Sequence, residues 1–191
     1  MKHFKFSLFI ILIMAAGRIS SPAGIQAERI EQYIQVNQHE IIQEFIQLLS
    51  IPNVSSDTDN IRNNAEFISA MMEQRGIDTR IMETPGNPVI FGELKTEGAE
   101  KTLMFYVHYD GQPVDPSQWT GTHPFRPALR PGKLEAGTHK PKPIPFPDKN
   151  ASYDPDWRIY ARGSSDDRAP ITGILAAIDA LRDTDIPLRH N

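Results

Sequence analysis

The sequence contains no cysteine among its 191 residues. This absence excludes a disulfide framework, a thiolate metal site, a cysteine nucleophile and a lipid attached to an N-terminal cysteine. Any metal ion would therefore be held by His, Asp and Glu side chains. A chain of this length is expected to fold as one domain, since domains cluster at roughly 100 to 150 residues.

The sequence also lacks a strong excess of charge of one sign. Its 20 Lys and Arg residues are interspersed among 24 Asp and Glu residues, which gives a net charge of −4. A protein that binds nucleic acid or an anionic membrane surface usually carries a basic face. We therefore expect no nucleic-acid partner.

Long apolar runs are missing except near the N-terminus. There, two lysines precede an apolar run from Phe6 to Ala16. This run is too short to cross a bilayer, which needs about 20 apolar residues, but it fits the core of a signal peptide. Residues 1–27 are predicted to be a signal peptide cleaved after Ala23 or Ala27, with an uncleaved N-terminal anchor as the alternative. Either interpretation predicts an extracytoplasmic protein, periplasmic or secreted, and cleavage would leave no stable membrane span.

Hydrophobic periodicity predicts three helices, over residues 28–50, 58–76 and 169–181. The first should end at Ser50 because Pro52 disfavours helical geometry in the residue before it. Thr58 or Asp59 could cap the second helix, and Gly76 is suited to end it in a left-handed conformation. The third follows a Gly-Ser turn and carries an apolar stripe.

Between the second and third helices the pattern changes to short runs of β-branched and aromatic residues. The predicted strands are Asp78–Met82, Pro88–Leu94, Thr102–His108 and Arg158–Ala161. We expect the third of these to be the most buried. A Pro-rich stretch at about residues 135–156 is predicted to be a surface insertion. Helices alternating with strands indicate an α/β layered domain.

Ionisable residues follow two of the predicted strands. His108 and Asp110 stand at the end of the third strand, and side chains two residues apart in extended backbone share a face. A carboxylate can accept the hydrogen bond of one imidazole N–H and so orient the other ring nitrogen toward a cation. Taken alone, this pair fits a hydrogen-bonded structural histidine as well as a metal ligand.

The second group follows the fourth strand, where Gly163 begins a turn that carries Asp166 and Asp167 into the third helix. One carboxylate here could simply cap the helix and complement its positive end. Two adjacent acids suggest that Asp167 serves the cap while Asp166 faces a cleft. Ser164 and Ser165 lie on the same turn, but the Gly-x-Ser-x-Gly pattern of a serine hydrolase is absent.

The two segments together resemble a known family. The runs Phe105–Val114 and Ala161–Pro170, with Trp119 and Pro124-Phe125 between them, are similar to the dizinc exopeptidases. That family includes carnosinases, aminoacylases, succinyl-diaminopimelate desuccinylase and glutamate carboxypeptidases. The carnosinase-like dipeptidases match best, through His-x-Asp-x-Gln-Pro and Arg-Gly-Ser-x-Asp-Asp. The resemblance extends from about residue 40 to the last residue.

The resemblance implies a three-layer α/β/α zinc-exopeptidase catalytic domain, phosphorylase/hydrolase-like, incomplete at the C-terminus, over residues 28–191. It makes His108 a terminal zinc ligand and Asp166 the carboxylate that bridges two Zn2+ ions. Asp110 becomes the catalytic-site carboxylate that orients His108, with Asp167 in support. The implied reaction is hydrolysis of a dipeptide or short peptide by a metallopeptidase. The alternatives are an N-acyl amino acid amidohydrolase and a secreted non-catalytic fragment.

This sequence departs from the family pattern in three ways. Arg168-Ala169 stands where the family usually has Lys-Gly, and the loss of that glycine could shift the turn. The Pro-rich stretch lengthens the segment between the motifs. The family also places its general-base Glu, the second metal's ligands and a dimerisation domain downstream of the region present here. The chain is therefore expected to be truncated and inactive alone, and the family's homodimer contact would lie outside it.

Overall fold

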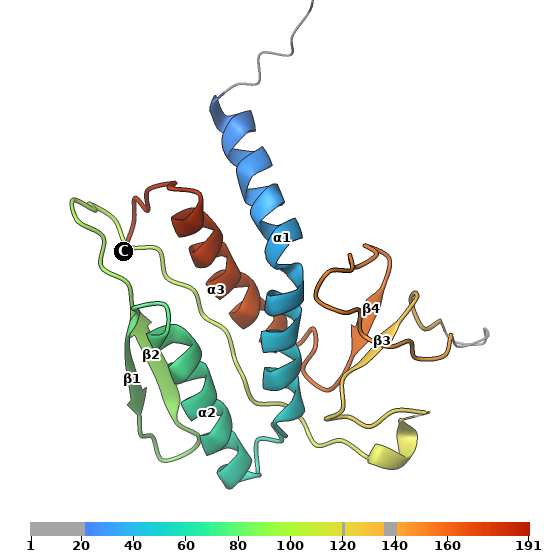
Figure 1. Cartoon of the computed structure of the whole chain (residues 1–191). Coiled ribbons are helices and arrows are strands. Elements are labelled where there is room, and N and C mark those ends of the chain that lie inside the picture. Colours follow the sequence, from blue (N-terminus) through green and yellow to red (C-terminus); the bar gives the residue numbers. More distant parts are fainter. Residues whose placement is uncertain (1–21, 120, 136–140) are drawn as a thin grey trace, which may run out of the picture.

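The computed structural model describes residues 22–119, 121–135 and 141–191 (Figure 1). A long central helix, α1 (Pro22–Ser50), packs beside α3 (Arg168–Asp183), and α2 (Thr58–Glu73) lies under a β-hairpin at the side of the molecule. A second small sheet lies on the other side of α1. The predicted signal peptide falls mostly outside the described residues, and residues 22–27 form the start of α1.

Helix α1 ends at Ser50 as predicted, but it begins at Pro22, before the predicted start at Glu28. Its N-terminal half extends beyond the other elements, and Val36 there is 71% exposed. Its C-terminal half is covered, with Leu48 and Leu49 fully buried. No helix within the described residues is long and apolar enough to cross a membrane.

Helix α2 begins at a different cap from the two predicted. Asp57, rather than Thr58 or Asp59, occupies the N-cap position, and its side chain accepts a hydrogen bond from the backbone N–H of Asn60 at 3.2 Å. This bond satisfies one of the donors that a helix N-terminus leaves open. Beyond the helix, Gly76 adopts φ +64°, the left-handed conformation predicted for it.

The hairpin that packs on α2 consists of β1 (Asp78–Met82) and β2 (Val89–Glu93), both close to the predicted ranges. The strands are antiparallel, with Arg80 paired to Phe91. Gly92 allows the close approach, since a Cβ there would lie 2.0 Å from Cε of Met72. The hairpin thereby covers the main core, whose fully or nearly buried members come from all three helices and two loops: Leu48, Ile61, Ala65, Ile68, Met71, Ile77, Tyr109 and Leu175.

The prediction that Thr102–His108 forms the most buried strand is wrong. The segment is extended, but within the described residues it belongs to neither sheet, and Met104 and Tyr106 are 83% and 87% exposed. Its backbone pairs only at one end, where Leu103 N donates to Asn191 O at 2.9 Å and Asn191 N donates to Lys101 O at 3.0 Å. A pattern of β-forming residues favours extended backbone, but a neighbouring strand is needed to bury it.

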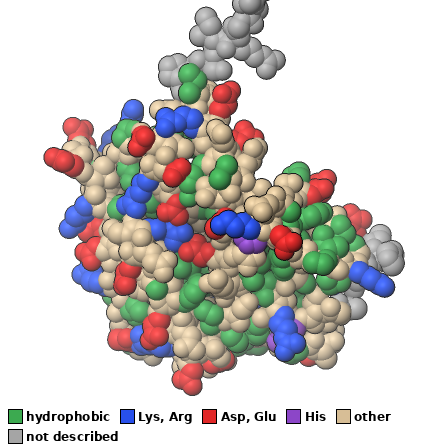
Figure 2. Space-filling model, viewed as in Figure 1, with side chains coloured by type: hydrophobic (Ala, Val, Ile, Leu, Met, Phe, Trp, Pro, Cys, Tyr) green, Lys and Arg blue, Asp and Glu red, His purple; other side chains and the backbone are tan. Residues whose placement is uncertain are grey.

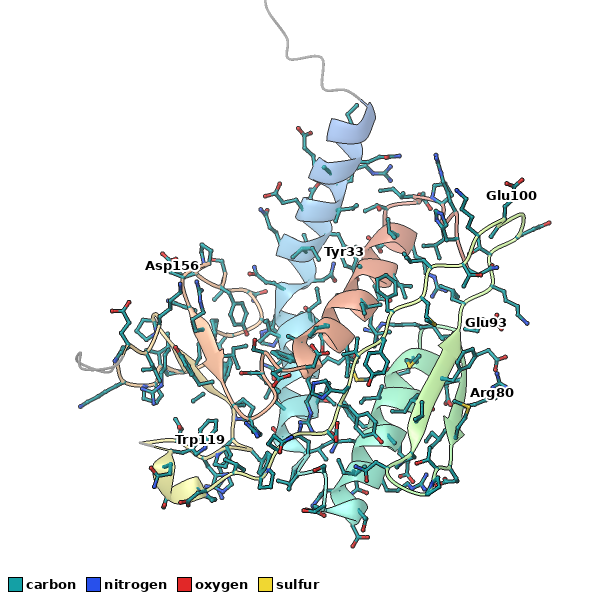
Figure 3. All side chains as sticks on the ribbon, turned by 180° about the vertical axis from the view of Figure 1, so that it is seen from behind. Tyr33, Arg80, Glu93, Glu100, Trp119 and Asp156 are labelled. Carbon is teal, nitrogen blue, oxygen red and sulfur yellow. The ribbon has the colours of Figure 1, made fainter. Side chains whose placement is uncertain are left out.

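The second sheet pairs β3 (Ala128–Arg130) with β4 (Arg158–Tyr160) in antiparallel register. Strand β4 is close to its predicted range, whereas β3 was not predicted because prolines flank it. The described part of the Pro-rich stretch contains no helix and pairs with β3 only through a single bridge from Ile144 to Leu129. This part of the molecule also holds the short 3-10 helix η1 (Pro116–Gln118), next to Trp119 (Figure 3).

Helix α3 covers the predicted range and extends it by less than one turn at each end. An ion-pair network holds it to the other helices: Arg75, just after α2, contacts Glu44 of α1 at 2.9 Å and Asp179 of α3 at 2.7 Å. Tyr33 lies on α1 toward α3 (Figure 3), and burial, followed by the charges of Asp179 and Asp183, raises its pKa. The α/β class is confirmed, with three α-helices and two small sheets in the described residues.

Candidate metal centre

The structure brings together His108 and Asp166, which are 58 residues apart in the sequence. Nε2 of His108 lies 3.0 Å from Oδ1 of Asp166. The histidine ends the extended segment that follows β2, and the aspartate comes from the turn between β4 and α3. The imidazole is 39% exposed and the Asp166 side chain 90% exposed, so an incoming ligand can reach both.

The other imidazole nitrogen is held by Asp110. Nδ1 of His108 lies 2.9 Å from the backbone carbonyl oxygen of Asp110 and 3.4 Å from its carboxylate Oδ1. The carbonyl is therefore the nearer acceptor for an Nδ1 proton, whereas the sequence analysis assigned that contact to the carboxylate. With Nδ1–H donating to this carbonyl, Nε2 donates to Asp166 when the ring is protonated, and in the neutral ring its lone pair is free to bind a metal ion.

Burial by itself disfavours the charged imidazolium of His108. Hydrogen bonds to the Asp110 carbonyl and to the Asp166 carboxylate, together with the charges of both aspartates, outweigh it and raise the pKa of His108. The same concentration of negative charge that stabilises an imidazolium also attracts a metal cation. A proton and a metal ion thus compete for the same position between His108 and Asp166.

Asp167 occupies the N-cap position of α3, but its side chain makes no capping hydrogen bond. The expectation that its carboxylate caps the helix is therefore wrong. The peptide bond between Asp166 and Asp167 is cis. Ala169, in place of the family's glycine, packs against a small cluster of Phe45, Leu49 and Ala161.

Asn53 is a site-forming residue that the sequence analysis passed over. It is fully buried, its Nδ2 donates to Tyr109 O at 3.0 Å, and its backbone carbonyl accepts from Gly111 N at 2.7 Å. It thus holds the backbone on both sides of Asp110. A Cβ on Gly111 would lie 3.0 Å from Asn53 Nδ2, so this position favours glycine. The sequence signal for Asn53 is its position between Pro52 and Val54, inside the stretch of resemblance that begins at about residue 40.

Arg168 was treated in the sequence analysis only as a substitute for the family's lysine. Among the described residues, it is the largest fully buried side chain. Its guanidinium donates to the backbone carbonyls of Tyr109, Leu48 and Ile51 and to Oδ1 of Asn64, over 2.6 to 3.3 Å. Burial lowers its pKa to about 10.

His108 and Asp166 fit two ligand positions of one zinc ion. Donors bound at about 2.0 to 2.2 Å with a tetrahedral angle lie roughly 3.4 Å apart, and the observed separation of Nε2 and Oδ1 is 3.0 Å. Imidazole and carboxylate are donors that suit zinc. The described residues hold no group of three His, Cys, Asp or Glu side chains arranged for a metal. Two close donors are fewer than the three or four protein ligands of a complete zinc site.

No family model matches the chain. Among curated proteins, it is 24% identical to "Cys-Gly metallodipeptidase dug1" of Schizosaccharomyces pombe over 86% of this chain and 32% of that protein. It is also 24% identical to the human "Beta-Ala-His dipeptidase", over 94% of this chain and 34% of that protein. The chain thus spans about a third of the length of these curated relatives.

Solved structures that match the chain are also peptidases. An M20 family metallo-carboxypeptidase, Sso-CP2 from Sulfolobus solfataricus, matches with a TM-score of 0.56 and 30% identity, over 76% of this chain and 28% of that one. Human carnosine dipeptidase 1 matches with a TM-score of 0.62 and 21% identity, over 84% of this chain and 32% of that one. The relationship to dipeptidases and carboxypeptidases predicted from the two motifs is confirmed, and the fold is that of a part of their catalytic domain.

Proposed function

We propose that this chain supplies two ligands, His108 and Asp166, to the zinc site of a metallopeptidase that hydrolyses dipeptides or short peptides. The observation that carries the proposal is the 3.0 Å contact between His108 Nε2 and Asp166 Oδ1, formed by two segments remote in sequence. The metallodipeptidase relatives support the same reaction. A complete zinc site has three or four protein ligands, so it needs groups beyond these two.

Each residue of the candidate metal centre has a distinct role in the proposed zinc site. His108 would bind zinc through Nε2, while its Nδ1–H donates to the Asp110 carbonyl oxygen and thereby fixes the ring orientation. The Asp166 side chain is 90% exposed, so its carboxylate would be accessible to bridge two cations. Zinc bound there would polarise the scissile carbonyl and lower the pKa of a bound water.

Zinc titration of the 191-residue chain, followed by calorimetry, tests the proposed site. We expect weak binding, because the described residues provide two close donors where a complete zinc site has three or four protein ligands. His108→Ala and Asp166→Asn should each abolish it, while Asp115→Asn, at the exposed cap of η1, should not. Binding that survives both substitutions would contradict the proposal.

The reaction itself is tested on the natural protein that carries this sequence, assayed on a panel of dipeptides and N-acyl amino acids with and without chelator. Chelator-sensitive release of amino acids from dipeptides supports the peptidase. Activity confined to N-acyl substrates would instead assign an amidohydrolase. No activity on either class would favour a non-catalytic fragment.

We also propose an extracytoplasmic location, on the basis of the apolar run Phe6–Ala16 and the small residues after it. N-terminal sequencing of the protein from a cell fraction tests this proposal. A mature N-terminus after Ala23 or Ala27 in an extracytoplasmic fraction supports it. An intact N-terminus in the cytoplasm refutes it.

A further inference from the structure

Among the residues that the structure describes, no carboxylate pairs with the buried guanidinium of Arg168. Every hydrogen bond recorded for its guanidinium within the described residues goes to a neutral oxygen, three of them backbone carbonyls. Burying an ion in this way is costly, and an apolar side chain of similar volume would often stabilise a fold at least as well. Simple core packing therefore gives a poor account of an arginine at this position.

The contacts of Arg168 reach both segments of the candidate metal centre. Its Nε donates to the carbonyl of Tyr109, the residue between His108 and Asp110. Asn53 Nδ2 donates to the same carbonyl, so two donors fix the orientation of this peptide group. The adjacent backbone then presents the Asp110 carbonyl to His108 Nδ1 at 2.9 Å.

Arg168 also closes the turn that carries Asp166. Its backbone N–H donates to Gly163 O at 3.2 Å, and the turn between these two residues holds Asp166. Gly163 has φ +78°, and a Cβ there would lie 3.1 Å from Cδ of Arg168. The turn therefore packs directly on the arginine stem. One residue thus touches the backbone that bears the histidine and the turn that bears the aspartate.

We propose that Arg168 is a positioning residue, which sets the distance between His108 and Asp166 and thereby the metal affinity of the pair. This inference rests on the proposed zinc site. The remaining contacts, to Leu48 and Ile51 at the end of α1 and to Asn64 of α2, anchor the guanidinium in the fold. Helices α1 and α2 thus hold the arginine in place, and the arginine in turn positions His108 and Asp166.

The test compares Arg168→Met and Arg168→Lys with the control Arg75→Met. Arg75 also joins the helices, through Glu44 and Asp179, but none of its recorded hydrogen bonds reaches the candidate metal centre. Each variant of the full chain is titrated with Co2+, whose absorption spectrum reports ligand geometry, and its thermal unfolding is measured. We expect Arg168→Met to weaken Co2+ binding at least tenfold and alter the spectrum. Arg168→Lys should recover part of the affinity.

Arg75→Met should lower the melting temperature while leaving Co2+ affinity within twofold. Equal losses of metal affinity in Arg168→Met and Arg75→Met, or wild-type affinity in a folded Arg168→Met, would overturn the inference. If Arg168→Met does not fold, Arg168→Lys decides, because one ammonium group cannot reproduce the forked contacts and should weaken binding severalfold. A folded Arg168→Lys with wild-type affinity would overturn the inference.

Failure of the proposed function is distinguishable, because wild-type protein would then bind no metal at the pair. The 15N shifts of the His108 ring at fixed pH provide a readout that needs no metal. They report the contacts of Nδ1 and Nε2, and Arg168→Met should change them while Arg75→Met should not. Unchanged shifts in a folded Arg168→Met would refute the positioning role by themselves.

Discussion

A substitution at Tyr109 should lower the stability of the fold without changing metal binding at the candidate metal centre. It lies between His108 and Asp110, and because side chains alternate in extended backbone, its ring points into the core while theirs face the candidate metal centre. Its hydroxyl donates to Pro88 O at 2.6 Å. Tyr109→Phe removes this buried hydrogen bond and leaves the proline carbonyl without that donor.

Leaving a buried acceptor unsatisfied costs about 1 to 3 kcal/mol. We therefore expect Tyr109→Phe to lower the free energy of unfolding by about 1 to 2 kcal/mol at pH 7, toward the low end because the ring remains in place. Urea unfolding monitored by circular dichroism measures the loss. Metal binding by His108 and Asp166 should be unaffected, since the substitution leaves the backbone contacts of residue 109 intact.

The pH dependence of stability gives a second test of the same side chain. Burial, followed by the charge of Asp110, raises the pKa of Tyr109 from 10.0 to about 12. A raised folded pKa means that the unfolded chain loses its proton first, so the contribution of Tyr109 is present below pH 10 and is lost as the pH rises toward 12. The stability gap between wild type and Tyr109→Phe should narrow over this range. A gap that is absent at pH 7, or constant to pH 12, would refute the reasoning.

Three further predictions concern other parts of the chain. In metal-free protein, the pKa of His108 is raised above 6.5, so its contribution to stability is present below pH 6.5 and is lost as the pH rises through the pKa of the folded state. His108→Gln should remove this pH dependence of the free energy of unfolding, measured in urea. Asp57→Ala should cost about 1 kcal/mol by loss of the α2 cap, and Asp59→Ala clearly less; equal losses in thermal unfolding would contradict the assigned cap. Gly92→Ala should destabilise by about 1 kcal/mol, because its Cβ would lie 2.9 Å from Cγ2 of the buried, β-branched Ile77, although the flexible end of Met72 can move aside. Gly86→Ala meets only an atom 3.8 Å away and should be nearly neutral.

The sequence by itself determined the helices and the chemistry of the two motifs. Apolar periodicity predicted the bounds of α1, α2 and α3 to within a turn or two. Each of these helices buries one face, and the apolar residues of that face recur every three or four positions in the sequence. Asp78–Met82 was likewise fixed by its β-branched residues and the proline-glycine turn after it. The residue types at positions 108, 110 and 166 limited the site to imidazole and carboxylate chemistry.

Tertiary structure decided whatever depends on a partner remote in sequence. The run Thr102–His108 has the composition of a buried strand, yet without a neighbour along most of its length it stays exposed. The 3.0 Å approach of His108 to Asp166 and the burial of Arg168 depend on how α3 packs against α1 and on the contact of Arg168 with Asn64 of α2. Local propensity fixes the backbone of a segment, but burial, pairing and convergence depend on contacts between segments, which a single sequence pattern does not contain.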